Sequence, residues 1–307
     1  MSGSGIIRIG SRGSQLALWQ AHHVAGLLRG RGHVVEIEVI KTTGDRLQEV
    51  TFAQVGSKGM FTLEIEEALA AGRIDLAVHS LKDLPTELPE QFALGATPPR
   101  VDPRDVLVSR DFASFQELPK GARVGTSSLR RRAQLRALRP DLEYVEFRGN
   151  VDTRLRKLGE GQAEAIVLAA AGLDRLEKTE WIRERIEPEV VCPAAGQGAL
   201  GIEIRAGDVR VSQVVGFLND PATRFAVTAE RIALASLGGG CQVPIGVHCR
   251  PAAIGGYEIL GAVADPEVSR VMRSYATGDQ AEDLGRAVAA DLLQQGASEL
   301  FEGIGTH

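Results

Sequence analysis

The side chains best suited to bind an anion lie in one short stretch, Gly-Thr-Ser-Ser-Leu-Arg-Arg-Arg-Ala-Gln at residues 125–134. One of the three hydroxyl residues at 126–128 can cap a helix, which places Arg130, Arg131 and Arg132 in or near its first turn. Cations there oppose the positive end of the helix dipole, whereas the free amides of a helix N-terminus bind anions. The pattern therefore predicts an anionic ligand at this turn.

Arginine is concentrated around this stretch. Residues 123–156 contain nine Arg, no Lys and four acidic residues, a local charge of +5 in a chain whose net charge is −5. The planar guanidinium suits two-pronged contacts with carboxylate or phosphate. We expect ligand binding by Arg131, Arg132, Arg148 and Arg154, and a solvated helix face for Arg136, Arg139 and Arg156.

A candidate catalytic carboxylate follows an apolar strand. The segment His-Ser-Leu-Lys-Asp-Leu-Pro at residues 79–85 comes directly after the strand pattern at 74–78. Ligands of open α/β sheets bind at the carboxyl ends of strands. Asp83 can act there as a general acid or base, or as a counter-ion to a developing cation, and Lys82 favours its ionised form. A simple turn residue before Leu-Pro is equally consistent with the spacing.

The first strand-to-helix turn, residues 10–14, holds Arg12 and Ser14. It occupies the same topological position as the turn at 125–134. Two basic turns at strand ends, one in each domain, could face each other across a cleft. Ser14 can also be a helix cap.

Among the three cysteines, Cys241 has the context of a reactive thiol. It follows Gly-Gly-Gly, which frees the backbone and exposes the sulfur for covalent attachment or nucleophilic attack. Cys249 shares a predicted strand face with apolar residues and Cys192 stands beside a proline, so both are expected to pack in the core. Neither cysteines nor histidines show ligand spacing, and we predict no metal site.

Composition limits the class of protein. The chain has 307 residues, enough for two or three domains, with 44% apolar and 24% charged residues. This balance argues against disorder, and the acidic net charge with 5% aromatics argues against a general nucleic-acid binder. There is no apolar run of about 20 residues and no signal-peptide layout. A cytoplasmic, reduced protein is expected.

Alternating strand and helix patterns predict an α/β fold. Strand patterns at 6–9, 34–40 and 74–78 are separated by helical patterns at 16–28 and 61–71. The same alternation restarts after residue 103, which favours right-handed crossovers and largely parallel sheets. We predict two doubly wound domains, each with a mixed, mostly parallel sheet, and a small α+β domain at the C-terminus.

Two turn-rich segments mark crossings between the first two domains. Three prolines occur in residues 97–103, and residues 192–198 read Cys-Pro-Ala-Ala-Gly-Gln-Gly. The apolar strand at 200–204 is expected to return to the first sheet. The predicted domains are 1–99 with 199–219, 100–198, and 220–307.

Together these stretches resemble the porphobilinogen deaminase family. The matching motifs run in the family's order over nearly the whole chain and thin out after about Arg250. They are Arg12, residues 16–20, 55–59, 79–85, 103–105, 126–132, 148–150, 170–173 and 193–198, and Gly-Gly-Cys at 239–241. Their joint occurrence is specific. One departure is Leu63, where a lysine is more usual.

The resemblance implies a transferase of haem biosynthesis that joins four porphobilinogen molecules head to tail with loss of ammonia. It implies a dipyrromethane cofactor on a thioether to Cys241, and Asp83 as the catalytic residue. The implied cofactor-binding residues besides Cys241 are Ser80, Lys82, Thr126, Ser128, Arg130, Arg131 and Gln197. The implied substrate-binding residues are Arg12, Ser14, Arg148, Arg154 and Arg175. It also implies that the first two domains are periplasmic-binding-protein-like, in a cytoplasmic monomer without nucleic-acid or membrane partners.

Two other functions stay open on the residues alone. A non-catalytic, two-lobed anion-binding module would explain the arginines and the crossings. It gives no role to the glycines before Cys241, and a solute binder usually needs an export signal. A nucleic-acid binder could use the arginines near Arg130, against the acidic net charge and the scarcity of aromatics.

Overall fold

The computed structural model describes residues 5–43, 62–239, 244–265 and 270–302. The chain divides into two compact units. The first comprises Met1–Val101 with Ala199–Arg224, and the second comprises Asp102–Gly198 with Phe225–His307.

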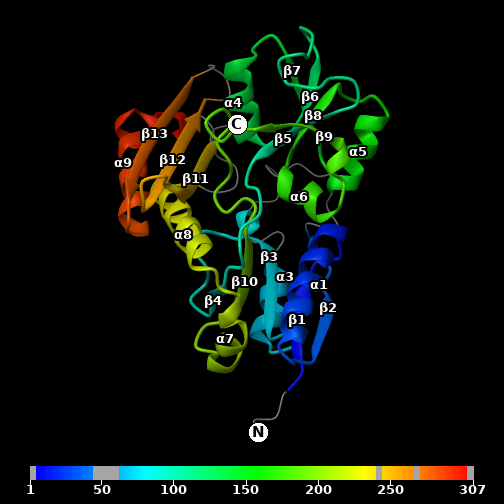
Figure 1. Cartoon of the computed structure of the whole chain (residues 1–307), viewed down its shortest axis with the longest axis vertical. Helices are drawn as coiled ribbons and strands as arrows, with labels where there is room; N and C mark the ends of the chain where they lie inside the picture. The colour runs from blue at the N-terminus through cyan, green and yellow to red at the C-terminus, as the bar shows by residue number, and fades with distance from the viewer. Residues whose placement is uncertain (1–4, 44–61, 240–243, 266–269, 303–307) are drawn as a thin grey trace. The chain divides into compact units, whose positions relative to one another are not determined.

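The first unit is built on a five-stranded sheet with the order β2-β1-β3-β10-β4 (Figure 1). Strands β1 to β4 run in one direction and β10 runs against them. Strand β10 lies between β3 and β4, so the predicted return of residues 200–204 to this sheet is confirmed. The elements are β1 (Ile7–Ser11), α1 (Gln15–Gly30), β2 (Val35–Val39), α3 (Leu63–Ala70), β3 (Leu76–Ser80), η2 (Leu81–Asp83), β4 (Phe92–Ala96), β10 (Leu200–Arg205), α7 (Val209–Val215) and η4 (Gly216–Leu218).

Helices cover both faces of this sheet because successive strand residues point to opposite sides. Leu76 and Val78 of β3 pack in a cluster with α1 and α7. Ala77, between them, packs in a second cluster with Ile65 and Leu69 of α3. Both faces of β3 are therefore packed against apolar residues. The polar residues of the strand come at its carboxyl end, where a ligand can reach them.

The second unit contains a sheet of the same pattern, with the order β7-β6-β8-β5-β9. Here β5 is the reversed strand, antiparallel to β8 and β9, while β6, β7 and β8 are parallel. Helix α4 packs on one face through Leu135, and α5 packs on the other through Leu155 and Leu158. The elements are β5 (Asp105–Ser109), β6 (Arg123–Gly125), α4 (Leu129–Leu138), β7 (Glu143–Val145), α5 (Val151–Gly159), β8 (Ala165–Ala169), α6 (Ala170–Arg175), η3 (Thr179–Trp181) and β9 (Ile182–Ile186).

The rest of the second unit is a three-stranded antiparallel sheet with helices on it. The sheet order is β11-β12-β13, and apolar residues of α8 and α9 pack in one cluster with its strands. Glycine at position 285 lets the two helices approach closely, since a Cβ there would lie 2.5 Å from the Ala229 carbonyl oxygen. The elements are α8 (Pro221–Ser236), β11 (Ile245–Pro251), β12 (Tyr257–Ala264), β13 (Val271–Gly278), α9 (Ala281–Gln294) and α10 (Ala297–Glu302).

The predicted fold class is confirmed. The structure has two mixed α/β sheets, each with four strands in one direction and one reversed, and a small three-stranded antiparallel sheet with helices packed on it. Over the residues that the structure describes, no helix is both long and apolar enough to cross a bilayer.

The approach of α8 and α9 can be tested with a pair of glycine substitutions. Gly285→Ala is expected to lower the free energy of unfolding by about 2 kcal/mol, because its new methyl group overlaps a backbone carbonyl. Gly26→Ala, inside α1 and with no atom within 4 Å of the added Cβ, is expected to raise it by roughly 0.5–1 kcal/mol. Urea unfolding followed by circular dichroism measures both. If Gly285→Ala unfolds at the same urea concentration as the wild type, α8 and α9 do not approach each other closely at position 285.

Candidate active site

A pocket opens at the carboxyl ends of β1 and β3 in the first unit. These strands are parallel neighbours, so the turn after β1 and the short helix η2 after β3 meet at one edge of the sheet. The polar residues that line the pocket include Arg12, Ser14, Gln20, His79, Ser80 and Asp83. The exposed Asp83 and the half-buried Arg12 thus line the same cavity.

Hydrogen bonds fix the walls of this pocket. Ser14 is the N-cap of α1, and its Oγ accepts from the Ala17 amide. Gln20 Nε2 donates to Ser80 Oγ at 2.7 Å, which ties α1 to the end of β3. Behind the wall, His79 Nε2 lies 2.9 Å from the buried Glu203 carboxylate of β10. The pocket can hold an anion at Arg12 and a group that exchanges a proton at Asp83.

The arginines of the second unit gather at the corresponding edge of its sheet. Helices α4, α5 and α6 follow the parallel strands β6, β7 and β8, so their first turns lie at the carboxyl ends of those strands. Ser128 caps α4 and Asn150 caps α5 through side-chain oxygens. Gly149, at φ 118°, makes the tight turn between Arg148 and the cap, and a Cβ there would lie 2.6 Å from Thr153.

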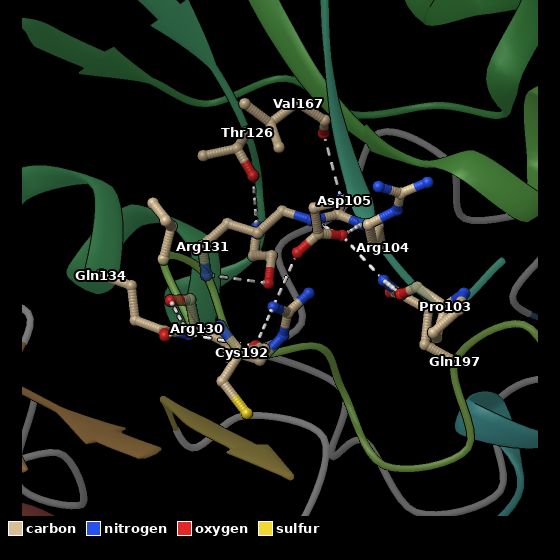
Figure 2. Close-up of polar contacts among 12 residues, drawn as sticks. Pro103, Arg104, Asp105, Thr126, Arg130, Arg131, Gln134, Val167, Cys192 and Gln197 are labelled. Carbon is tan, nitrogen blue, oxygen red and sulfur yellow. Dashed lines mark hydrogen bonds and ion pairs between the residues drawn. The ribbon is translucent and has the colours of Figure 1, made fainter. Parts of the chain in front are cut away.

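A fully buried carboxylate anchors two of these arginines (Figure 2). Arg130 Nη1 donates to Asp105 Oδ2 at 2.7 Å, and Arg131 donates from Nε and Nη2 to Oδ1 at 3.0 and 2.8 Å. Gln197 Nε2 donates to the same Oδ1 at 2.9 Å. Asp105 can reach these partners because β5 runs antiparallel to β8 and begins beside the end of β8.

The charges of this cluster do not cancel. Burial alone would raise the pKa of Asp105, but the guanidiniums of Arg130 and Arg131 lower it far below the ordinary value. The carboxylate therefore stays ionised, and two guanidiniums face one negative charge. A buried excess of positive charge is costly unless an anion joins it, so the cluster suits a carboxylate ligand.

Asp105 is the residue that the sequence interpretation missed. In the sequence it stands only as the last residue of the family motif at 103–105, with no role assigned to it. The signal that could have found it is the excess of arginine in residues 123–156, since buried arginines need a buried carboxylate.

The turn at 193–198 is held against the same cluster. Gln197 Nε2 donates to the Pro103 carbonyl at 2.7 Å as well as to Asp105, and Gln197 is buried. Arg175 Nη2 donates to the Gly198 carbonyl at 2.8 Å. Burial lowers the pKa of Arg175 to about 10, still well above neutrality, so this arginine is also a buried cation at the same edge.

The other predicted arginines differ in their surroundings. Arg148 Nε donates to the half-exposed Glu146 carboxylate at 2.6 Å, and Arg154 is half-buried on α5. The prediction of a solvated face was wrong for Arg139, which donates to the Phe115 and Leu118 carbonyls and to Asp141. Arg139 is a structural residue because its guanidinium satisfies backbone oxygens of the chain before α4.

The remaining site residues are placed as follows. Thr126 is buried, and its Oγ1 accepts from the Ser128 amide at 3.2 Å. Lys82 is half-buried in η2 next to Asp83. Cys241 and the motif at 55–59 lie outside the described residues.

Cys192 and Cys249 are buried free thiols. Cys192 Sγ lies 3.6 Å from the Leu260 carbonyl oxygen, and burial raises the pKa of its thiol to about 12. Cys249 is 1% exposed in the core of the three-stranded sheet. Both are packing residues, as predicted.

Comparison with known proteins gives a consistent result over nearly the whole chain. Residues 7–213 match the family model described as porphobilinogen deaminase, dipyromethane cofactor binding domain, and residues 224–294 match the model of the porphobilinogen deaminase C-terminal domain. A porphobilinogen deaminase of Roseiflexus castenholzii is 51% identical, with 97% of this chain and 99% of the relative covered. One of Syntrophobacter fumaroxidans is 48% identical, with 97% and 98% covered.

Similarity to solved structures is weaker. A putative methionine-binding lipoprotein of Bacillus subtilis aligns with 72% of this chain and 93% of its own, at 13% identity and a TM-score of 0.45.

The buried state of Cys192 predicts how the native protein reacts with an alkylating reagent. Burial raises the pKa of the Cys192 thiol to about 12, so the thiol stays protonated near pH 8, and only the thiolate attacks. Cys192 is therefore expected to stay unlabelled by iodoacetamide in the native protein and to label fully after unfolding in guanidinium chloride, as measured by peptide mass. Rapid labelling of native Cys192 would contradict its burial.

Proposed function

The chain belongs to the porphobilinogen deaminase family, and we propose that it works as a hydroxymethylbilane synthase through one carboxylate and a set of arginines. This transferase joins four porphobilinogen molecules head to tail and releases one ammonia at each addition. The observation that supports the proposal most directly is the pocket that Asp83 and Arg12 line together.

Asp83 is the proposed catalytic residue. When the carbon–nitrogen bond of porphobilinogen breaks, ammonia leaves and a cation remains on the substrate. A new carbon–carbon bond then forms to a pyrrole ring, and that ring carbon loses its proton. A carboxylate can protonate the leaving amine, stabilise the cation and accept the ring proton. Asp83 is exposed at the pocket, where a substrate can reach it.

The arginines are proposed to bind the acetate and propionate groups of the pyrroles. Each added unit brings two carboxylates, so the growing chain is a polyanion. Arginine binds carboxylates with paired hydrogen bonds, and the second unit presents several at one edge of its sheet. The proposed substrate-binding residues are Arg12, Ser14, Arg148, Arg154 and Arg175.

The donor set fits a dipyrromethane cofactor, the group named in the description of the matching family model. The buried cluster at Asp105 has one positive charge in excess, and a carboxylate on a pyrrole would balance it. When bound, a dipyrromethane supplies the pyrrole carbon to which the first porphobilinogen is joined. The residues proposed to hold it are Cys241, Ser80, Lys82, Thr126, Ser128, Arg130, Arg131 and Gln197.

Cys241 is the proposed point of attachment. The described cysteines, Cys192 and Cys249, are almost completely buried, and Cys192 has a thiol pKa raised to about 12. Buried thiols of this kind are poor nucleophiles. This supports the assignment of Cys241, which follows three glycines in the sequence.

The finer organisation is also proposed. We assign three domains, 1–99 with 199–219, 100–198 and 220–307, the third of which carries Cys241. The protein is proposed to be a cytoplasmic monomer whose partners are porphobilinogen and the growing polypyrrole.

Substitution of the carboxylate tests the catalytic role. Asp83→Asn removes the group that handles the proton but keeps the size of the side chain, so porphobilinogen turnover is expected to fall by about 10²- to 10⁴-fold. Asp111→Asn, at an exposed position outside the pocket, serves as the control and should keep wild-type turnover. Ammonia release and porphobilinogen consumption report the rate. Near-normal turnover by Asp83→Asn would remove Asp83 from the mechanism.

Intact mass under denaturing conditions tests the attachment. The wild-type protein should carry an excess equal to two porphobilinogen units less two ammonia, mapping to Cys241 in a digest. Cys241→Ser should lack it, whereas Cys249→Ala should keep it. An unmodified wild-type chain that gains neither adduct nor product on incubation with porphobilinogen would favour the anion-binding module instead.

A further inference from the structure

The two arginines bound to Asp105 use their hydrogen-bond donors differently. A guanidinium has five N–H groups on three nitrogens. In Arg131 all three nitrogens are engaged, because Nε and Nη2 donate to Asp105 and Nη1 donates to the Val167 carbonyl at 3.1 Å. Arg131 is thus locked between the start of β5 and the strand β8.

Arg130 is held by one nitrogen only. Its Nη1 donates to Asp105 Oδ2 at 2.7 Å and to the Cys192 carbonyl at 2.6 Å. Over the part of the chain that the structure describes, Nε and Nη2 of Arg130 donate to no protein atom. The paired N–H groups of the Nε–Nη2 edge, and the second N–H of Nη2, are therefore available to a ligand, although the side chain is only 5% exposed.

The segment that carries Cys192 adds to the fixation of Arg130. Gln134 Nε2 donates to the Arg130 and Cys192 carbonyls, and Gln134 Oε1 accepts from the Cys192 amide at 2.8 Å. Arg130 is consequently held at its backbone by α4 and at Nη1 by the Cys192 carbonyl. The Asp105 carboxylate is the second acceptor at Nη1, and it fixes the direction in which the Nε–Nη2 edge points.

We propose that Asp105 is a positioning residue that aims the Nε–Nη2 edge of Arg130 at a carboxylate of a bound pyrrole. The inference rests on the proposed function, since it assumes that Arg130 binds such a carboxylate. Two observations support a role beyond folding. A single arginine would suffice to neutralise Asp105, yet two surround it. The edge of Arg130 opposite the bound Nη1 is the one with unused donors, and paired N–H groups match the two oxygens of a carboxylate.

A double-mutant cycle on assembly of the cofactor separates positioning from stability. Asp105→Asn keeps the shape but removes the charge, and it is expected to slow about tenfold or more the rate at which the folded apo-protein gains the dipyrromethane mass on incubation with porphobilinogen. Arg130→Gln should slow this step by a similar factor. The two losses should be clearly less than additive in the double variant, because Asp105 then has only Arg131 left to hold. Glu164→Gln, which breaks the pair with Arg123 at the other end of β6, is the matched control.

The cycle remains decisive if Asp105→Asn does not fold. The double variant keeps the same net charge in the cluster as the wild type, and its rate of cofactor gain can be compared with that of Arg130→Gln alone. A double variant more than tenfold slower than Arg130→Gln, or a folded Asp105→Asn with the wild-type rate, would overturn the proposal.

A second readout does not depend on turnover. In the apo-protein, the Arg130 Nε–H signal in a ¹⁵N NMR spectrum should shift when propionate is added, and Asp105→Asn should abolish that shift. A wild-type protein that shows the shift but never consumes porphobilinogen would contradict the proposed function and leave the positioning role supported. Absence of the shift in an active wild-type protein would contradict the positioning role alone.

Discussion

Burial of one carboxylate between two guanidiniums is the interaction on which the second unit depends. A charge that leaves water must find opposite charge and hydrogen bonds. Asp105 finds them only if three segments meet, because Arg130 and Arg131 come from α4 and Gln197 comes from the turn at 193–198. The start of β5, the first turn of α4 and that turn are therefore fixed by one another. The same arrangement creates a site for an anion, because the two guanidiniums carry one positive charge more than the carboxylate can neutralise.

The two five-stranded sheets share one strand pattern but use their carboxyl edges differently. In the first unit the edge carries an exposed carboxylate, Asp83, beside Arg12. In the second unit the carboxylate is Asp105, which is buried and locked by cations. An exposed carboxylate can exchange a proton with a ligand, whereas one held ionised by two arginines acts through its charge. One fold pattern thus presents an exposed carboxylate in one unit, which suits the proposed proton-handling role, and a buried carboxylate held by arginines in the other, which suits the proposed binding of a ligand carboxylate.

Local signals predicted the parts of the structure that depend on neighbouring residues. The hydroxyl residues at 126–128 predicted a helix start, and Ser128 is its cap. The apolar strand after the second crossing predicted the return of β10 to the first sheet. The partners of Asp105 could not be predicted in this way, because they lie 25 to 92 residues away and no local pattern records the pairing. The prediction for Arg139 was wrong because its carbonyl partners also lie far away in the sequence. Residue type gives the charge of a side chain but does not say how deeply it is buried.

The arginines differ in burial, and this difference suits a ligand that grows. Arg130 and Arg131 are 5% exposed, bonded to the buried Asp105 carboxylate, and fixed in place. Such residues can hold a part of the ligand that never changes, because moving a buried guanidinium would expose an unpaired carboxylate. Arg148 is 25% exposed and bonded to a half-exposed Glu146. An ion pair near the surface is weak, so a ligand carboxylate can replace Glu146 at little cost. This difference supports our proposal that the dipyrromethane is held at the buried arginines and that added units bind at the accessible ones.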